Sequence, residues 1–250
     1  MRISHDHPRF ISLETRERLV RGFQSGVVVS QGLIAHGRGE AFDYLLGEVT
    51  PKSSRAATRA AVALLLCARN PVISVNGNTA ALVPRDIVRL ARLIPAGLEV
   101  NLFHRSLARE QRIASLLKRN GASQVLGANA RARLRILGVA SPRRNVDAKG
   151  IGDADVVLVP LEDGDRAEAL RKAGKMVIVI DLNPMSRTSQ AATVTIVDNI
   201  IRAIPELVRI TLRMKLLSRS RLYAIVSSFD NERNLTSVMK EMIRYMEGWA

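Results

Sequence analysis

Apolar residues gather in short runs along much of this chain, and each run ends at turn residues. The runs are rich in Val and Ile, as in buried strands of a parallel sheet. Strands are predicted at 72–75, 98–103, 124–126, 156–160, 176–180 and 193–197. The segments between them carry apolar residues at helical spacing. Helices are predicted at 12–23, 41–46, 54–69, 79–93, 107–119, 131–137, 166–173, 200–217 and 235–249, with breaks at 218–221 and 227–231.

This order of elements predicts the fold class. Repeated strand–helix alternation favours an α/β fold with a parallel sheet and helices on both faces. Extra helices precede and follow the alternating part. We expect one domain over residues 1–250, with a helical N-terminal part at 1–69, a strand–helix core at 70–205 and C-terminal helices at 206–250.

Three polar clusters follow the last three predicted strands. They occupy residues 161–165, 181–188 and 198–199, and they hold carboxylates, amides and hydroxyls. Right-handed crossovers place the carboxyl ends of parallel strands on one side of the sheet. Ligands of open α/β sheets bind in the crevice outside those ends. The spacing therefore predicts that the three clusters form one site.

Composition narrows the class of protein. The 250 residues are 47% hydrophobic, which is enough to bury a substantial core. No apolar run has the roughly 18 residues of a membrane span, and the N-terminus lacks the apolar core of a signal peptide. Cys67, the single cysteine, excludes an internal disulfide and fits a structural thiol. We expect a cytoplasmic protein.

The formal net charge of +15 has two interpretations. A basic surface can bind a nucleic-acid backbone, or it can serve anionic small ligands. Aromatic residues make up only 4% of the chain, so platforms for stacking single-stranded bases are scarce. The basic residues are also spread over many predicted helices, so nucleic acid is the less favoured partner.

Three segments could hold an anion, and each has an ordinary structural alternative. Residues 76–81 predict a strand, a glycine turn and a helix start, with Asn78 as a possible N-cap. Residues 32–40 place Arg38 between glycines, as a ligand-binding loop or a flexible turn. Residues 51–55 offer two cations and two serines before a helix, where Ser53 or Ser54 could act as the cap.

The acidic side chains allow further alternatives. Glu162, Asp163 and Asp165 could bind Mg²⁺ or a substrate ammonium, or could simply suit the dipole of the helix that follows. Asp181 could accept hydrogen bonds from a ribose. The histidines have no metal-ligand partner at helical spacing, so no dedicated metal site is predicted. No nucleophilic triad is visible, which indicates chemistry based on positioning and electrostatics.

Several segments together resemble the archaeal phosphopantothenate synthetases, the 4-phosphopantoate–β-alanine ligases of coenzyme A biosynthesis. The resemblance runs in order and spacing from about His7 to Pro205. The segments that carry it are residues 36–45, 76–81, 159–166, 181–188 and 197–203. It implies a Rossmann-like fold, a homodimer, and ATP and Mg²⁺ as substrate and cofactor. It also implies amide formation through an acyl-adenylate, with release of AMP and diphosphate.

The resemblance also implies roles for residues that match its motifs. The residues expected to bind ATP are Arg16, Arg38, Asp181, Leu182, Asn183, Arg187, Thr188, Asn199 and Ile200. Those expected to face phosphopantoate are Lys52, Ser53, Asn76, Gly77, Asn78 and Arg105. Glu162 or Asp163 would receive the amine or Mg²⁺.

Two features are not explained by the resemblance. The arginines of the stretch 131–144 are unusually dense, and position 185 is Met. Two other hypotheses stay open. One is a noncatalytic nucleotide- or RNA-binding protein that uses its basic surface, and the other is a different ATP-dependent carboxylate–amine ligase on the same scaffold.

Overall fold

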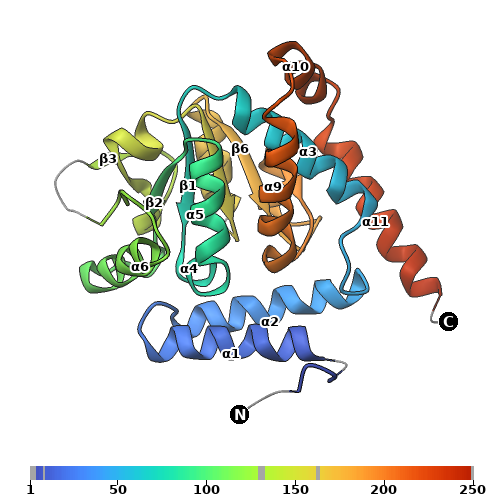
Figure 1. Ribbon diagram of the computed structural model, residues 1–250, viewed down its shortest axis with the longest axis horizontal. Coiled ribbons are helices and arrows are strands. Elements are labelled where there is room, and N and C mark those ends of the chain that lie inside the picture. The colour runs from blue at the N-terminus through green and yellow to red at the C-terminus, as the bar shows by residue number, and fades with distance from the viewer. Residues whose placement is uncertain (1–3, 8, 129–132, 162–163, 249–250) are drawn as a thin grey trace.

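The computed structural model describes residues 4–7, 9–128, 133–161 and 164–248, and Figure 1 shows the arrangement of its elements. Five parallel strands form the central sheet in the order β2-β1-β5-β6-β7. They are β1 (Pro71–Val75), β2 (Gly97–Val100), β5 (Val156–Pro160), β6 (Met176–Ile180) and β7 (Val194–Ile196). The predicted parallel α/β sheet is confirmed, and the strands that precede the three polar clusters are neighbours.

The two faces of the sheet have different covers. The helices are α1 (Phe10–Gln24), α2 (Ser30–Leu45), α3 (Lys52–Cys67), α4 (Gly77–Leu82), α5 (Pro84–Leu93), α6 (Leu107–Arg119), α7 (Gly164–Lys172), α8 (Arg187–Ala191), α9 (Ile200–Met214), α10 (Arg219–Ser227) and α11 (Asn231–Glu247). Ile73, Leu158 and Ile178 share a buried cluster with α3, α5 and α9. Val157 and Val177 point the other way, into a second cluster with α7. Side chains alternate across a strand, so both faces are buried, as predicted.

Residues 32–40 are the first correction. We expected a glycine-rich loop there and a helix only from residue 41, whereas the chain is helical throughout α2. Glycine weakens an isolated helix by about 1 kcal/mol relative to Ala. Gly32 is nevertheless required, because a Cβ there would lie 2.5 Å from Oδ1 of Asn78 on α4. Tertiary packing therefore overrides local propensity.

The predicted helix at 79–93 is two helices. Proline lacks an N–H and disfavours helical geometry in the residue before it, so the chain breaks at Val83 and resumes at Pro84. The cap prediction is also corrected. Asn76, rather than Asn78, is the N-cap of α4, since its side chain accepts the N–H of Thr79.

The region after α6 differs most from prediction. Residues 133–135, expected within a helix, form strand β3 (Arg133–Arg135), which pairs antiparallel with β4 (Asn145–Asp147). The expected strand at 124–126 is reduced to one bridge between Leu126 and Glu99. Two short helical turns, η1 (Pro142–Arg144) and η2 (Ala148–Gly152), flank β4. Residues 131–136 alternate arginine with Ala, Leu or Ile, which is the period of two typical of a strand, so the helix prediction there was wrong.

At the C-terminus, helices α9 and α11 confirm the predicted pattern, with ends shifted by a few residues. Helix α10 was missed because residues 218–221 and 227–231 were interpreted only as breaks. Ser218 is in fact its N-cap and accepts the N–H of Arg221.

Helices α1 and α2 lie together across the carboxyl edge of the sheet, below α4 and the lower end of α9 in Figure 1. The N-terminal part of the chain therefore covers the edge where the polar clusters end. Within the described ranges, every helix is too short or too polar to cross a lipid bilayer.

The sheet core gives a stability prediction. Ile178 is fully buried in β6, whereas Met176 on the same strand is 41% exposed. Ile178→Ala should lower the free energy of unfolding by about 2–5 kcal/mol, because it leaves a cavity between strand and helices. Met176→Ala should change it by no more than about 0.5 kcal/mol. Urea unfolding followed by circular dichroism measures both, and equal losses would contradict this account of the core.

Candidate functional site

The turn after β6 is built around the carboxylate of Asp181. Its Oδ1 accepts the N–H of Asn183 at 3.0 Å, and its Oδ2 accepts the hydroxyl of Ser186 at 2.5 Å. Ser186 caps α8 by accepting the N–H of Ser189. Asn183 Oδ1 accepts the N–H of Met185, while no acceptor for Asn183 Nδ2 occurs among the described residues. Hydrogen bonds therefore hold this turn in place, with the Nδ2 group of Asn183 as a donor for a ligand.

The neighbouring turn, after β7, is equally ordered. Asn199 is the N-cap of α9, and its Oδ1 accepts the N–H of Ile201. Ile200 is the first helical residue, and the first N–H groups of a helix have no partner inside it. Because β6 and β7 are adjacent, the structure brings the segment 181–188 next to 199–200. Two of the three predicted clusters thus share one edge of the sheet.

Helix α2 lies over this edge. Arg38 contributes a favourable electrostatic interaction to Asp181, and a Cβ on Gly39 would lie 3.6 Å from Leu182. Arg16 on α1 binds Glu40 of α2 through Nε and Nη2, at 2.9–3.2 Å. Both predicted arginines therefore belong to the helical layer that covers the carboxyl ends of the strands.

Two buried carboxylates give this part of the site unusual electrostatics. Burial raises the pKa of Asp181, although Ser186, Asn183 and Arg38 lower it in part. Burial also raises the pKa of Asp198, against the effect of Arg202. Burial disfavours the ionised form of a carboxyl group. A ligand that brings donors or positive charge to this floor would favour the ionised carboxylates.

Arg187 and Thr188 complete the turn after β6. Arg187 Nη2 binds Glu168 of α7 at 2.8 Å, with its side chain 71% exposed. Thr188 is buried at 3% exposure. To reach a ligand, Arg187 would have to leave its ion pair with Glu168. A surface ion pair contributes little free energy in water, so this exchange costs little.

The end of β1 holds a second group of predicted residues. The chain runs from β1 outward to β2 and later returns to β5 on the other side of β1, so the switch point of the sheet lies between β1 and β5. Asn76 spans that point, because its Nδ2 donates to the carbonyls of Pro160 and Leu161 at 2.9 and 3.1 Å. Asn78 Nδ2 donates to the carbonyl of Gly32 and ties α4 to α2.

Gly77 is required by close packing. A Cβ at this position would collide with the carbonyl oxygen of Val27 and with the guanidinium of Arg109. Arg109 in turn donates to the Val27 carbonyl at 2.9 Å and to the His104 carbonyl at 2.7 Å. The segment 76–78 therefore packs the N-terminal helices against the sheet, and this structural role is independent of any contact with a ligand.

Lys52 and Ser53 lie at the other end of the crevice, at the start of α3. The carboxylate of Glu241 on α11 accepts both of their N–H groups, at 2.8 and 3.1 Å, and also the Ser53 hydroxyl. The expected serine cap is thus wrong, since a carboxylate from another helix caps α3. Ser54, the other expected cap, donates instead to the carbonyl of Val197 at 2.6 Å.

Sequence reasoning missed buried arginines around β1, β2 and β5. Arg109, Arg143 and Arg166 are 9%, 7% and 0% exposed. The predicted Arg105 is near them, paired with Glu110 and donating to the Asn145 carbonyl. Arg166 lies on the sheet face and donates to Ser74 at 3.2 Å. A fully buried arginine cannot be recognised from one sequence, because the charge alone predicts exposure.

The first acidic cluster stays a prediction, since Glu162 and Asp163 lie outside the described residues. Leu161, directly before them, has φ of +55°, a left-handed conformation that is costly for a residue with a Cβ. Such strain is often found at functional sites. In the described part of the chain, no three His, Cys, Asp or Glu side chains come together as metal ligands.

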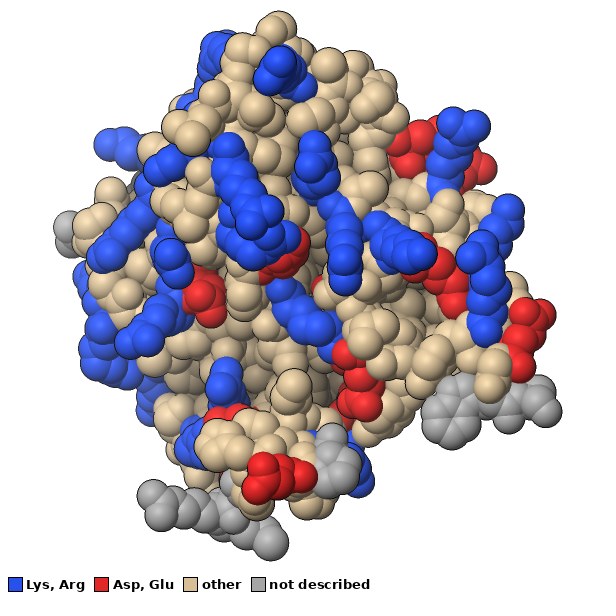
Figure 2. All heavy atoms as spheres, turned by 45° about the vertical axis from the view of Figure 1, so that its right-hand side comes forward, with Lys and Arg blue, Asp and Glu red and all other residues tan. Residues whose placement is uncertain are grey.

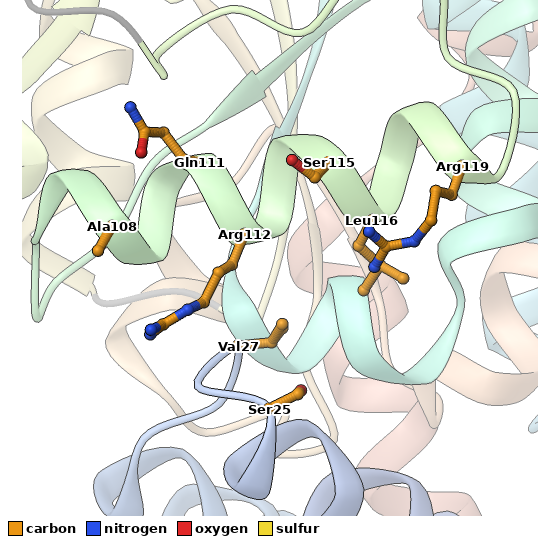
Figure 3. A pocket seen from close by; sticks show the side chains of 8 residues that line it. All are labelled: Ser25, Val27, Ala108, Gln111, Arg112, Ser115, Leu116 and Arg119. Carbon is orange, nitrogen blue, oxygen red and sulfur yellow. The ribbon is translucent and has the colours of Figure 1, made fainter.

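A cavity of about 500 Å³ lies next to the β1 side of the site, because Val27 lines it and the Val27 carbonyl packs against Gly77. It separates the connection between α1 and α2, at Ser25 and Val27, from the outer face of α6, which carries Arg112, Ser115 and Arg119 (Figure 3). These polar residues are exposed to solvent. The hollow is therefore an open surface groove beside the site.

Together these groups occupy the carboxyl edge of the sheet, and its two sides differ in chemistry. The β6–β7 side offers main-chain donors, amides and two carboxylates, which suit a ribose and phosphates. The β1–β2 side offers cations held in place by buried hydrogen bonds, which suit an anionic substrate. Cys67, the single cysteine, ends α3 shortly before β1 begins, at the opposite edge of the sheet, and burial raises its pKa.

The electrostatics predict a measurable pKa change. Arg38→Ala should raise the pKa of Asp181 further, because it removes a cation that favours the carboxylate. A carboxyl with a raised pKa binds its proton more tightly in the folded state, so its contribution to stability falls as pH rises from the ordinary range through the raised pKa. Carbon-13 NMR titration of the Asp181 carboxyl tests this; an unchanged or lower pKa in the variant, with Arg59→Ala as control, would contradict it.

Comparison with known proteins places the chain in one family. The sequence model of the phosphopantothenate/pantothenate synthetase family matches residues 53–245. The 4-phosphopantoate–β-alanine ligase of Methanosarcina mazei is 50% identical over 248 residues, 99% of this chain and 97% of that protein. That of Thermococcus onnurineus is 50% identical over 240 residues, 96% and 91% of the two chains.

A third relative extends the likeness. The 4-phosphopantoate–β-alanine ligase of Methanospirillum hungatei is 52% identical over 207 residues, which cover 83% of this chain and 84% of that protein. The segment that the family model matches includes all five strands of the sheet. The chain belongs to the phosphopantothenate/pantothenate synthetase family.

Proposed function

We propose that this protein is an ATP-dependent ligase that joins (R)-4-phosphopantoate to β-alanine, giving 4′-phosphopantothenate, AMP and diphosphate in coenzyme A biosynthesis. The observation that carries the proposal is the 50% identity, over 99% of the chain, to a relative with that name. The crevice supports it independently, because it joins a turn suited to a nucleotide to a side rich in buried cations.

ATP would occupy the β6–β7 side. Asn183 Nδ2 and the N–H of Ile200 are donors from adjacent turns, and Asp181 would accept from the ribose. Arg38 from the covering helix would bind phosphate oxygens, with Arg16, Arg187 and Thr188 at the margins. These groups come from α1, α2, α8, α9 and two strand ends, and the fold brings them together at one edge of the sheet. This proximity supports the assignment.

Phosphopantoate would occupy the β1 side. Asn76–Asn78 and Arg105 lie there, and the substrate carries both a phosphate and a carboxylate. Lys52 and Ser53 lie instead by β7, three strands away, or about 14 Å at the usual strand spacing. Phosphopantoate would have to pass beneath the ATP residues to contact both groups. We therefore favour Asn76–Asn78 with Arg105 for the acid.

The reaction would proceed in two displacements. A carboxylate oxygen of phosphopantoate attacks the α-phosphorus of ATP, diphosphate leaves, and an acyl-adenylate forms. The neutral amine of β-alanine then attacks the acyl carbon, loses a proton and displaces AMP. The chain contributes fixed cations and N–H donors, which stabilise charge that develops on phosphate oxygens.

Mg²⁺ would enter with ATP. The described residues provide no cluster of three metal ligands, and Mg²⁺ commonly binds substrate phosphates with only one or two protein carboxylates. When bound, it would neutralise charge on the phosphates. We keep Glu162 and Asp163 as candidates for the metal or for the β-alanine ammonium. A homodimer in the cytoplasm also remains part of the proposal.

The central test is an assay for AMP. Incubation with ATP, Mg²⁺, 4-phosphopantoate and β-alanine should release AMP and diphosphate in equal amounts, together with 4′-phosphopantothenate identified by mass spectrometry. Omission of either organic substrate should abolish product, since both are needed to complete the two displacements. A wild-type protein that releases no AMP with this or any other pair of acid and amine fails as a ligase.

The same assay distinguishes the alternatives. Use of another acid or amine in preference would indicate a different ligase on this scaffold. Figure 2 shows Lys and Arg side chains over much of one face, with acidic groups among them. On α9, Glu206 has Arg209, Arg55 and Arg213 as electrostatic neighbours. Tight RNA binding that weakens steeply with salt, without ligase activity, would favour the noncatalytic hypothesis.

Variants test the ATP assignment. Arg38→Ala and Asn183→Ala should each lower kcat/KM for ATP by roughly 10- to 100-fold, about 1.4–2.7 kcal/mol, because each removes a donor to ATP. Arg59→Ala on α3, an exposed arginine outside the crevice, is the control and should behave as wild type. An unchanged kcat/KM for ATP in both site variants would contradict the assignment of ATP to the β6–β7 side.

A further inference from the structure

A buried cluster of charges lies behind the ATP side of the crevice. Arg202 on α9 stands between two carboxylates: its Nε donates to Asp198 Oδ1 at 2.8 Å, and its Nη1 donates to Asp43 Oδ2 at 3.2 Å. Asp43 and Asp198 are only 4% and 1% exposed. Thr50 donates its hydroxyl to the other oxygen of Asp198 at 2.7 Å. Three segments of the chain, α2, the loop before α3 and the start of α9, thus meet in this cluster.

This cluster fixes the loop that carries Asn199 and Ile200. Asn199 Nδ2 donates to Asp43 Oδ2 at 2.7 Å, and its main-chain N–H donates to Asp198 Oδ1 at 2.8 Å. Its carbonyl accepts from α9, and its Oδ1 accepts the N–H of Ile201. Every polar group of Asn199 is therefore in use. Among the described residues nothing accepts the N–H of Ile200, so this group is the donor left for a ligand.

The same cluster fixes the covering helix. Asp43 is the member that lies on α2, five residues after Arg38 on the same helix. An α-helix is stiff over so short a length, so the position of Asp43 against α9 sets the position of Arg38 above Asp181. The buried guanidinium of Arg202 thus links the N–H of Ile200, which follows β7, to Arg38, which lies over the end of β6.

We propose that Asp43, Asp198 and Arg202 are positioning residues for ATP, which hold the N–H of Ile200 and the guanidinium of Arg38 in one geometry without touching the nucleotide. This inference rests on the proposed ATP site. Donors that are fixed before a ligand arrives bind it better, because little ordering remains to be done on binding. Asp198 belongs to the third predicted polar cluster, whereas Asp43 and Arg202 were not expected from the sequence to act in the site.

A purely structural role predicts a different result. If the cluster only stabilised the fold, a variant would contain less folded protein, and the remaining molecules would bind ATP normally. Apparent kcat would then fall while KM and Kd for ATP stayed the same. A positioning role instead weakens ATP binding in molecules that are folded.

The experiment compares the full-length wild type with Asp43→Asn and Arg202→Lys. Calorimetric titration with Mg-ATP gives Kd and, from the stoichiometry, the fraction of competent protein; steady-state AMP release gives KM. Asp43→Asn should raise Kd and KM for ATP at least tenfold, with KM for β-alanine changed less than twofold. Arg202→Ala should raise Kd and KM for ATP more than Arg202→Lys does, because lysine keeps the charge but not the forked donors.

The matched control is Glu206→Gln, which removes another acid–arginine pair of α9 on the exposed face. It should leave Kd and KM unchanged. Normal Kd for ATP in Asp43→Asn and Arg202→Ala, even with a lowered melting temperature, would overturn the positioning role. Wild type that binds ATP but releases no AMP would refute the ligase and leave the Kd comparison valid, whereas wild type that binds no ATP would refute both.

Discussion

The common direction of the five strands is the constraint on which this structure depends. It brings every carboxyl end to one edge, where backbone groups and polar turns would otherwise face water. Helices α1 and α2 cover that edge and are held there by side chains from the turns themselves. Asn78 binds the carbonyl of Gly32, and Asp43 binds Asn199. The candidate site therefore lies where a separate helical layer covers the carboxyl edge of a parallel sheet.

The sequence allowed much of this arrangement to be predicted, because two of its signals are local. Buried parallel strands are continuous apolar runs, as at Val156–Pro160 and Met176–Ile180, and turn residues mark where they end. Right-handed crossovers then make the direction of neighbouring strands predictable. The clusters at Asp181 and Asn199 could be joined on this basis alone, although only the family resemblance suggested ATP.

The missed features depend on contacts between residues far apart in the chain. Gly32 looks like a loop residue until Asn78, 46 positions later, occupies the space of its missing side chain. The start of α3 looks self-capped until Glu241 supplies the carboxylate from α11. Local propensity cannot supply such partners, and these errors concentrate where the covering helices meet the sheet. The strand β3 is a different kind of error, because the alternation of arginine with apolar residues at 131–136 already has the period of a strand.

The charge cluster at Arg202 shows what such contacts contribute. Two buried carboxylates share one guanidinium, and the raised pKa of Asp198 shows that burial disfavours its charge. Removal of one partner from a buried ion pair costs about 3–5 kcal/mol, yet a well-packed apolar replacement of the whole cluster is often as stable. Apolar side chains could not, however, accept the N–H and Nδ2 groups of Asn199. The specific contribution of the charged groups is therefore orientation. They fix the direction of the turn that begins α9 and the position of α2 relative to that turn.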